Sequence, residues 1–370
     1  MTRERWSEKE IWDWYNRRPW LRGCNFLPSN AVNYIDMWQT LHKEEILRCA
    51  DKELELAAKT GFNTLRLILN FTVWREERDG FFEMTDAWLA LCQAHGIQVM
   101  FTLGNDCLVP KNQQYQEPHV GEQHYDWGYH GGRKNSPHQS HGEMGFSPLD
   151  EPETAALQYE WVRQVITRYR EDPRVCVWDL YNEPGNSKRD GVTLPHLKRF
   201  FEIAREADPC QPLTAAAWRD WTIGTPELSQ VERYALEHSD LVSYHCYGGL
   251  EAQVRAISHL KEYGRPILNT EWLCRCTGCT IEQLFPLFCL EKVGCYNWGF
   301  VAGLYQTYEP HNAVWEAHEK GQMRDFDFRL WFHDLYRPSL KPYNPKETEL
   351  IRRMCDLSDR LFYKKHPETP

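Results

Sequence analysis

The chain has 370 residues, of which 42% are hydrophobic, 26% charged and 14% aromatic, as is typical of a folded globular protein. No run approaches the roughly 20 consecutive apolar residues of a membrane span, and the first residues contain no apolar run resembling a signal peptide. We therefore expect a soluble cytoplasmic protein with no membrane partner. The formal net charge of −10, without clustered Lys and Arg, argues against a nucleic-acid partner.

The 13 cysteines are scattered from Cys24 to Cys355 without a pairing pattern, so we interpret them as free thiols in a reducing compartment. Cys274, Cys276 and Cys279 form a local cluster, but they lack the second pair of a zinc ribbon, and a metal site there is the weaker alternative. The 16 Trp, 18 Tyr and 16 Phe residues have two interpretations. Their rings fit the C–H faces of sugars, or they fill a large core.

Eight short β-type runs alternate with amphipathic helical stretches along the chain. The runs cover residues 21–28, 62–70, 97–104, 175–184, 213–218, 241–247, 266–273 and 295–303. The helical stretches include residues 44–61, 86–96, 154–172, 194–208 and 281–294. This alternation predicts an α/β fold, a (β/α)8 TIM barrel, more than an open doubly wound sheet. The glycine-rich phosphate loop of a nucleotide-binding fold is missing after the first run.

We predict one catalytic barrel domain over residues 1–370, with its core at about 20–303. Residues 105–150 form a long stretch after the third run, which places a lid-like loop over the C-terminal mouth of the barrel. Residues 304–370 supply the last loop and a terminal helix on the outside. The histidines of the long stretch have an irregular spacing, so a metal site is again the weaker alternative; they are His119, His124, His130, His138 and His141.

Two glutamates lie near the ends of apolar runs, Glu183 in the fourth run and Glu271 in the seventh. A carboxylate at the end of a barrel strand is costly to bury unless it is paired, so two such groups suggest a pair across the barrel mouth. Two carboxyl groups are what glycoside hydrolysis requires, one as an acid and the other as a nucleophile or base. The alternative is that each glutamate caps a helix or pairs with a cation such as Arg66.

Five features together carry a family resemblance, and in chain order they are Arg66, Asn182-Glu183-Pro184, His245-Cys246-Tyr247, Thr270-Glu271 and Trp298. In this order they resemble clan A of the glycoside hydrolases, and the chain is similar to family 5 within it over about residues 20–303. The resemblance implies that Glu183 is the acid/base and Glu271 the nucleophile. It also implies that Trp298 is a substrate platform and that Arg66 lies beside the nucleophile.

Residues 22–29 and 296–303 most closely resemble a branch of this family that is often labelled xylanase- or mannosidase-like. One position departs from the family pattern. Family 5 members commonly carry a His at the end of the second or third strand, where this chain has Asn70 and Asn105. We include Asn70 among the predicted substrate contacts.

The chemistry of the other predicted contacts can be argued from the residues themselves. Asn182 can donate to a sugar 2-hydroxyl, or it forms a turn before Pro184. Tyr247 and Arg66 can hold Glu271 ionised, although a purely structural ion pair is the alternative for Arg66. His245 contacts the acid/base or substrate, or it is a satisfied core residue.

Four tryptophans are candidates for sugar stacking or for the core, and Trp298 is the strongest of them; the others are Trp218, Trp74 and Trp272. We also expect Glu183 to have a raised pKa and Glu271 to be ionised, because the acid must hold a proton and the nucleophile must not.

The sequence thus predicts a retaining β-glycosidase that acts on short oligosaccharides or glycosides by double displacement, with exo action favoured and no cofactor or metal. An endo-acting mannanase, xylanase or glucanase is the alternative within the same chemistry. A non-catalytic carbohydrate-binding barrel is the alternative from another class. The expected partner is a carbohydrate, and the sequence gives no prediction of the oligomeric state.

Overall fold

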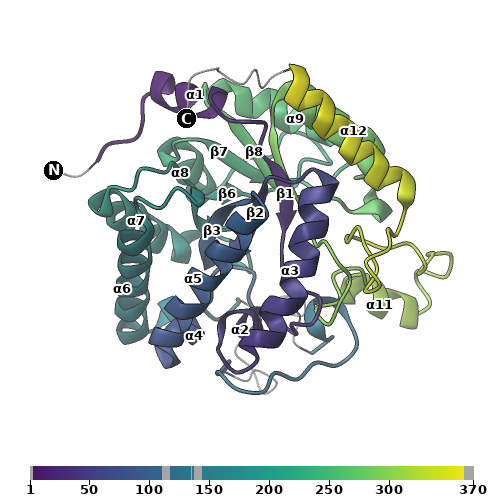
Figure 1. The fold of residues 1–370 in the computed structure, drawn as a ribbon, viewed down its shortest axis with the longest axis horizontal. Helices are drawn as coiled ribbons and strands as arrows, with labels where there is room; N and C mark the ends of the chain where they lie inside the picture. The colour runs from purple at the N-terminus through teal and green to yellow at the C-terminus, as the bar shows by residue number, and fades with distance from the viewer. Residues whose placement is uncertain (1–2, 111–116, 135, 137–143, 362–370) are drawn as a thin grey trace.

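Parallel strands form a barrel ringed by helices in the computed structural model (Figure 1). The structure describes residues 3–110, 117–134, 136 and 144–361. The strands are β1 (Arg22–Asn25), β2 (Thr64–Ile68), β3 (Gln98–Asn105), β4 (Val175–Asn182), β5 (Leu213–Thr214), β6 (Ala216–Ala217), β7 (Val242–His245), β8 (Ile267–Trp272) and β9 (Gly294–Trp298). They follow the order β5-β4-β3-β2-β1-β9-β8-β7-β6, so the two edges of the sheet belong to strands that are consecutive in the chain.

The predicted (β/α)8 barrel is confirmed, with one difference in the fifth position. The run at 213–218 is divided into β5 and β6 by Ala215. The amide of Ala215 donates to the Ser239 hydroxyl at 3.1 Å. The barrel therefore closes through one residue whose backbone is bonded to a side chain.

The helices surround the barrel in the alternation that the sequence predicts, and each of the five predicted stretches overlaps a helix of the structure. They are α1 (Glu8–Asn16), α2 (Tyr34–Trp38), α3 (Lys43–Thr60), α4 (Phe71–Glu76), α5 (Arg78–Ala94), α6 (Pro152–Tyr169), α7 (Asp190–Ala207), α8 (Gln230–His238), α9 (Leu250–Leu260), α10 (Ile281–Glu291), α11 (Asn312–Glu319) and α12 (Pro345–Leu361). Within the described residues, no helix combines the length and the apolar character needed to cross a bilayer.

Helix α3 shows how apolar spacing and a glycine set an element. Ile46, Ala50, Leu54 and Ala57 recur every three or four residues, and all four are buried. The helix ends at Gly61, whose φ of 100° favours glycine. A Cβ at Gly61 would meet Cys355 of α12, so the same glycine permits the terminal helix to pack closely.

Helix α12 confirms the predicted terminal helix and lies along the outside of the barrel (Figure 1). Arg22 of β1 holds it through an ion pair with Asp359, with 2.7 Å between Nη2 and Oδ2. A second, buried ion pair joins Arg275, in the loop after β8, to Glu347 at 2.7 Å. The chain after β9 is thereby fixed to the barrel at both ends of this helix.

Helix α1 closes the end of the barrel opposite to α2 and α11 (Figure 1). Its Ile11 and Tyr15 join an apolar cluster with Leu21, Met100 and Leu268 of the barrel wall and floor. This helix is not among the helical stretches predicted from the sequence. Its signal is a capping box in which Ser7 and Glu10 bond each other's backbone amides.

Strand register aligns the polar ends of the strands at the other end of the barrel. Asn25 pairs with Arg66 on one side and with Trp298 on the other. Asn105 pairs with Asn182, and His245 pairs with Glu271. Because parallel strands present their carboxyl ends at one mouth, the register places the predicted functional residues together.

Gly23 of β1 packs directly against the backbone of β2, and a substitution there tests this packing. A Cβ there would lie 1.9 Å from the carbonyl oxygen of Thr64, which is backbone and cannot move aside. We expect Gly23→Ala to lower the free energy of unfolding by about 3 kcal/mol or more. Gly191 in α7 is the matched control, because nothing lies within 4 Å of its Cβ position. Urea titration of both variants makes the comparison, and equal stabilities would contradict the packing.

Candidate active site

Glu183 lies directly after β4 and is 8% exposed. Its backbone has φ 47°, a left-handed conformation that is rare for a side-chain-bearing residue. Its Oε1 lies 2.6 Å from His245 Nδ1. Its Oε2 accepts from the Cys107 thiol at 2.9 Å and from the Asn186 amide. The carboxyl group is thus held by three groups, Asn186 from its own loop, Cys107 from the loop after β3 and His245 from β7.

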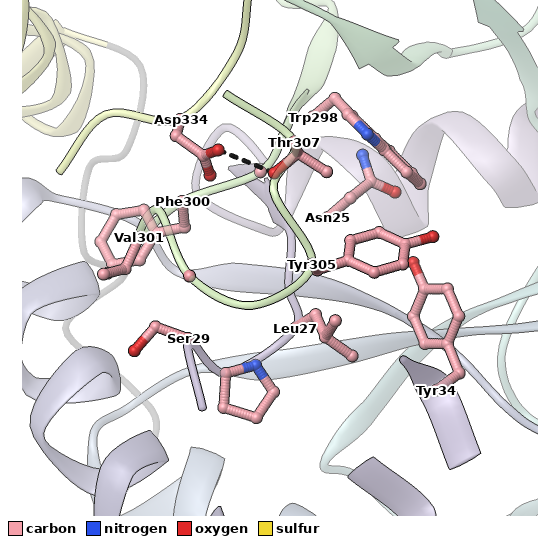
Figure 2. Close-up of a pocket in the computed structure, with 13 residues that line it drawn as sticks. Asn25, Leu27, Ser29, Tyr34, Trp298, Phe300, Val301, Tyr305, Thr307 and Asp334 are labelled. Carbon is pink, nitrogen blue, oxygen red and sulfur yellow. Dashed lines mark hydrogen bonds between the residues drawn. The ribbon is translucent and has the colours of Figure 1, made fainter. Parts of the chain in front are cut away.

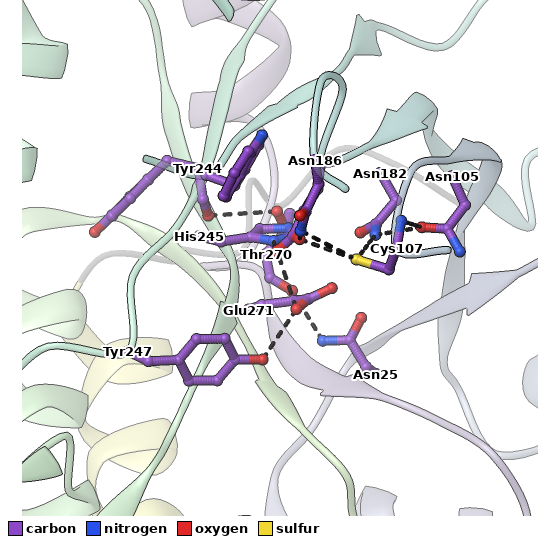
Figure 3. A network of polar contacts seen from close by, with 12 residues as sticks. Asn25, Asn105, Cys107, Asn182, Asn186, Tyr244, His245, Tyr247, Thr270 and Glu271 are labelled. Atoms are coloured by element: carbon purple, nitrogen blue, oxygen red, sulfur yellow. Dashed lines mark hydrogen bonds and ion pairs between the residues drawn. The ribbon is translucent and has the colours of Figure 1, made fainter. Parts of the chain in front are cut away.

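Glu271 of β8 faces the same space and is 5% exposed. Its Oε1 accepts from Arg66 Nη1 at 2.8 Å, and its Oε2 accepts from the Tyr247 hydroxyl at 2.9 Å. His245 Nδ1 lies 3.4 Å from Oε2. Figure 3 shows Tyr247 and His245 directed toward Glu271. The structure therefore brings together the residues that the sequence predicted around this glutamate.

Arg66 is fully buried and bonds side chains of three other strands. Two of its nitrogens donate to Asp179 Oδ2 of β4 at 2.9 and 2.7 Å, and Nη1 donates to Asn25 of β1 at 2.7 Å. Burial acts to lower the pKa of Arg66, but the charges of Asp179 and Glu271 outweigh it and raise the pKa. Arg66 therefore makes both predicted interactions: Nε and Nη2 bond Asp179 in a structural ion pair, and Nη1 bonds Glu271.

Asn182 is held on both sides in the unliganded site. Its Oδ1 accepts from Arg66 Nη2 at 2.6 Å, and its Nδ2 donates to Asn105 Oδ1 at 2.8 Å. Figure 3 shows Asn182 and Asn105 facing each other beside Cys107. This orientation is fixed by tertiary contacts rather than by the turn that precedes Pro184.

The protonation of the two glutamates differs from the expectation. Burial alone would raise the pKa of Glu183, but the contact with His245 and the bonds from Cys107 and Asn186 lower it to about 2. Burial and the neighbouring charge of Glu183 raise the pKa of Glu271, against the effects of His245 and Arg66. The expected raised pKa of Glu183 was therefore wrong, because His245 lies closer to Glu183 than to Glu271, at 2.6 against 3.4 Å.

Glu183, His245 and Glu271 are also the residues best placed to hold a cation. One ligand atom of each lies within 4.8 Å of the others, and this is the one such group found in the described part of the chain. All four carboxylate oxygens already accept from protein donors. Neither the lid histidines within the described ranges nor Cys274, Cys276 and Cys279 form such a group; His138 and His141 lie outside the described residues.

Trp298 ends β9 and lines a pocket of about 340 Å³ next to the carboxyl pair. Figure 2 shows its ring facing Asn25, with Tyr34 and Tyr305 on the adjacent wall. Asp334 lines the far side of the pocket and accepts from the Thr307 hydroxyl at 2.7 Å. Trp298 is the predicted aromatic residue whose surroundings best suit a sugar platform.

The remaining predicted contacts lie outside this hydrogen-bond network. Asn70 accepts from the Val73 amide at 3.0 Å and is the N-cap of α4. Trp218 donates to the Pro184 carbonyl at 3.1 Å, so it supports the turn that carries Glu183. Trp74 and Trp272 are at most 1% exposed and belong to the core. A helix cap such as Asn70 and a core residue such as Trp74 have the same local sequence pattern as a ligand contact. Only the tertiary structure distinguishes these uses.

Residues 117–134, which we name the mouth segment, lie against two other loops at the barrel mouth. Gln123 accepts from Asn33 at 2.9 Å, and the Gly131 amide donates to the Tyr305 carbonyl at 2.8 Å. The His130 ring stacks on Tyr305 with 4.8 Å between centroids and lies 5.7 Å from the Trp298 ring. The mouth segment therefore covers the side of the mouth next to Trp298.

Four residues of the network were not predicted from the sequence: Asn25, Cys107, Asp179 and Asn186. Asp179 carried a signal, because it is a charge within the apolar run Val175–Asn182. Asn25 and Cys107 lie at strand ends, as a contact residue of a barrel should. Their partners are far away in sequence, so the residue types alone did not single them out.

No family model matches the chain. A segment of 60 residues is 37% identical to a probable mannan endo-1,4-β-mannosidase C of Aspergillus terreus, and it covers 16% of this chain and 13% of that protein. The chain thus matches only a small part of that curated relative.

Among solved structures, the chain is similar to an exo-β-1,4-mannosidase from Opitutaceae bacterium strain TAV5, with a TM-score of 0.58 and 14% identity over 93% of this chain and 60% of that one. A glycoside hydrolase family 5 mannosidase from Rhizomucor miehei gives a TM-score of 0.52 and 14% identity over 92% and 94% of the two chains. The resemblance to family 5 is confirmed at the level of the fold.

Asp334 predicts a pH dependence of stability. Burial raises its pKa to about 7, although Thr307 and Arg275 favour the charged form. The folded protein therefore keeps a proton that the unfolded chain releases at lower pH, so this contribution is complete below about pH 4 and is lost as the pH rises through about 7. We expect Asp334→Asn to remove up to about 3 kcal/mol of the difference in the free energy of unfolding between about pH 5 and about pH 8.

Urea titration at the two pH values measures this difference. Asp79→Asn is the control, because Asp79 is an exposed residue of α5. Glu53, whose pKa burial also raises to about 7, remains in the variant and keeps part of the slope. Identical pH slopes in the wild type and Asp334→Asn would contradict the prediction.

Proposed function

We propose that the protein is a retaining β-glycoside hydrolase that works by double displacement, with Glu183 as acid/base and Glu271 as nucleophile. The observation that carries the proposal is the close approach of the buried pair: one oxygen of each carboxyl group lies within 4.8 Å of one oxygen of the other, and both groups contact His245 Nδ1, at 2.6 and 3.4 Å. Retaining glycosidases place their carboxyl groups about 5–5.5 Å apart, whereas inverting enzymes leave about 6.5–9.5 Å for a water. The TIM barrel and the position of both groups at the C-terminal mouth agree with it.

In the first step, a Glu271 oxygen attacks the anomeric carbon as the bond to the leaving oxygen breaks, and that oxygen takes the Glu183 proton. In the second step, a water gives its proton to Glu183 and its oxygen to the anomeric carbon, which releases Glu271. Arg66 and Tyr247 orient the attacking carboxylate through one bond to each oxygen. The Asn182 amide is placed beside Glu183 to meet the sugar 2-hydroxyl once substrate replaces its bond to Asn105.

The proposed first step needs a proton on Glu183, whereas the contacts within the site lower the pKa of Glu183 and raise the pKa of Glu271. Bound substrate must therefore shift the exchange of the proton toward Glu183. A glycosidic oxygen next to Glu183 favours this exchange, because it can accept a hydrogen bond from a neutral acid and not from a carboxylate.

The mouth segment supports exo action on short β-linked oligosaccharides. It meets the loop after β1 through bonds from Asn33 to Gln123 and from Gln39 to Gly121, and it meets the loop after β9 through the bond from the Gly131 amide to the Tyr305 carbonyl at 2.8 Å. A cleft covered next to Trp298 leaves room for few sugar units on that side, which favours removal of a terminal unit. The named activities of the matching proteins make β-mannosides the first substrates to test.

A cytoplasmic location is part of the same proposal. All 13 cysteines are free thiols in the structure, as a reducing compartment requires. Short imported glycosides are the substrates available there. A carbohydrate-binding barrel without catalysis is the alternative that the assays below would reveal.

Alanine variants of the two glutamates separate their roles. Glu183→Ala should lose about 10²–10⁴-fold in kcat/KM on glycosides with poor leaving groups and much less on activated aryl glycosides, which need little protonation. Added azide should restore turnover and give the β-glycosyl azide. Glu271→Ala should lose about 10⁴-fold or more on every substrate, and any azide product should have the α configuration. A panel of aryl glycosides with NMR of the products makes these measurements.

The isosteric variants Glu183→Gln and Glu271→Gln control for folding, which circular dichroism monitors. If NMR shows the first-formed sugar with inverted configuration, the retaining mechanism is wrong. Dialysis of the wild type against EDTA is the metal control. Loss of activity that a single divalent cation restores would assign Glu183, His245 and Glu271 to a metal centre instead.

Exo action is tested with a β-1,4-linked mannotetraose labelled at its reducing end. The wild type should release mannose from the unlabelled end, and successive labelled products should each be one unit shorter. Shortening of the mouth segment should increase the share of longer released products, because the side of the cleft next to Trp298 is opened. Random internal cleavage by the wild type would favour the endo alternative.

A further inference from the structure

The three residues that end and follow β3 all bond the turn that carries Glu183. Asn105 Oδ1 accepts from Asn182 at 2.8 Å. Asp106 Oδ2 accepts from the Gly185 amide at 2.7 Å, and its Oδ1 accepts from the Tyr181 hydroxyl at 2.8 Å. Cys107 completes the set, since its thiol reaches the carboxyl group of Glu183 itself at 2.9 Å.

This support matters because the turn is strained. Glu183 has φ 47°, a left-handed conformation that is unfavourable for a residue with a side chain. The strained backbone aims the carboxyl group into the mouth, and its donors decide the rotation of the group. His245 holds Oε1, whereas Cys107 and Asn186 hold Oε2.

We propose that Cys107 is a positioning residue for the acid/base: its thiol fixes the Glu183 carboxyl group through Oε2 and sets the balance between its charged and protonated forms. The inference rests on the proposed function, in which Glu183 is the group that gives and takes the proton. Figure 3 shows the Cys107 sulfur between Asn186 and Asn182. Their amides lie 3.6 and 3.5 Å from the sulfur, so the thiol is itself held in place.

The chemistry of a thiol suits this task. Burial and the charges of Glu183 and Glu271 raise the pKa of Cys107 well above its usual range, so the group stays a neutral S–H donor. A neutral donor favours the charged carboxylate and lowers the pKa of Glu183, in the same direction as His245 and Asn186. An S–H bond is weak, so it directs Oε2 without preventing protonation when substrate binds.

The contact is tested first without any assay of activity. Iodoacetamide labels Cys107, and mass spectrometry follows the rate at each cysteine. Because the Glu183 charge holds the thiol protonated, Glu183→Gln should lower the pKa of Cys107 and speed its labelling about 10-fold per pKa unit. Labelling of Cys92, which is buried in α5 away from the site, should be unchanged. An unchanged rate at Cys107 overturns the inference, whatever the protein hydrolyses.

Kinetics then test the role. Cys107→Ala should move the alkaline limb of kcat/KM upward by about 0.5–1 pH unit, because Glu183 loses a donor that favours its charged form. Its loss of kcat should be larger for poor than for activated leaving groups, and Cys107→Ser should restore both values toward the wild type. Cys92→Ala is the control for loss of a buried thiol and should keep the wild-type pH profile.

The outcomes separate the two claims. If the wild type hydrolyses glycosides and Cys107→Ala keeps the wild-type pH profile, the positioning role is wrong and the proposed function stands. If the wild type hydrolyses no glycoside although labelling depends on Glu183, the proposed function fails, and the catalytic meaning of the contact fails with it.

Discussion

The buried guanidinium of Arg66 is the charge on which the mouth of this barrel depends. A buried cation is stable only when anions and hydrogen-bond acceptors surround it. Here Asp179 of β4 takes one edge of the group, and Asn25 of β1 and Glu271 of β8 take the other. Each partner comes from a different strand, so the contact that satisfies the charge also fixes where those strands end. Removal of Arg66 would leave two buried carboxylates uncompensated, and the geometry of the site follows from this requirement.

The fold and the two glutamates were predictable because their signals are local. Eight apolar runs with helices between them specify a barrel, and a carboxylate at the end of such a run stands out from the sequence. Asp179, Asn25 and Cys107 were missed because their meaning lies in partners far along the chain, such as Glu183, which lies 76 residues after Cys107. Asn70 shows the reverse error, since a strand-end asparagine also serves as a helix cap. Residue type and position did not distinguish these two uses.

The protonation of the pair was the least predictable property, for a physical reason. Roles assigned from a motif say which carboxyl group must carry a proton during the reaction. The pKa values of the two groups depend instead on small differences in the distances to their neighbours. His245 Nδ1 is 2.6 Å from Glu183 and 3.4 Å from Glu271, so it stabilises the charge of the former more strongly. Coupled groups of this kind titrate as a unit. Their order can change when a ligand brings a new hydrogen-bond partner to one of them.

The two carboxyl groups are also supported by different kinds of structure. Glu271 lies within β8, and its charged partner Arg66 lies within β2, so the proposed nucleophile is held by the wall of the barrel. Glu183 lies just outside β4 on a strained turn, and its donors Cys107 and Asn186 lie in loops. A nucleophile needs one fixed line of attack, whereas an acid/base must change its proton twice in each cycle and serve first a leaving group and then a water. The neutral loop donors at Oε2 of Glu183 permit that change, although His245 of β7 also holds its Oε1. A charged donor such as Arg66, held within a strand, would oppose it.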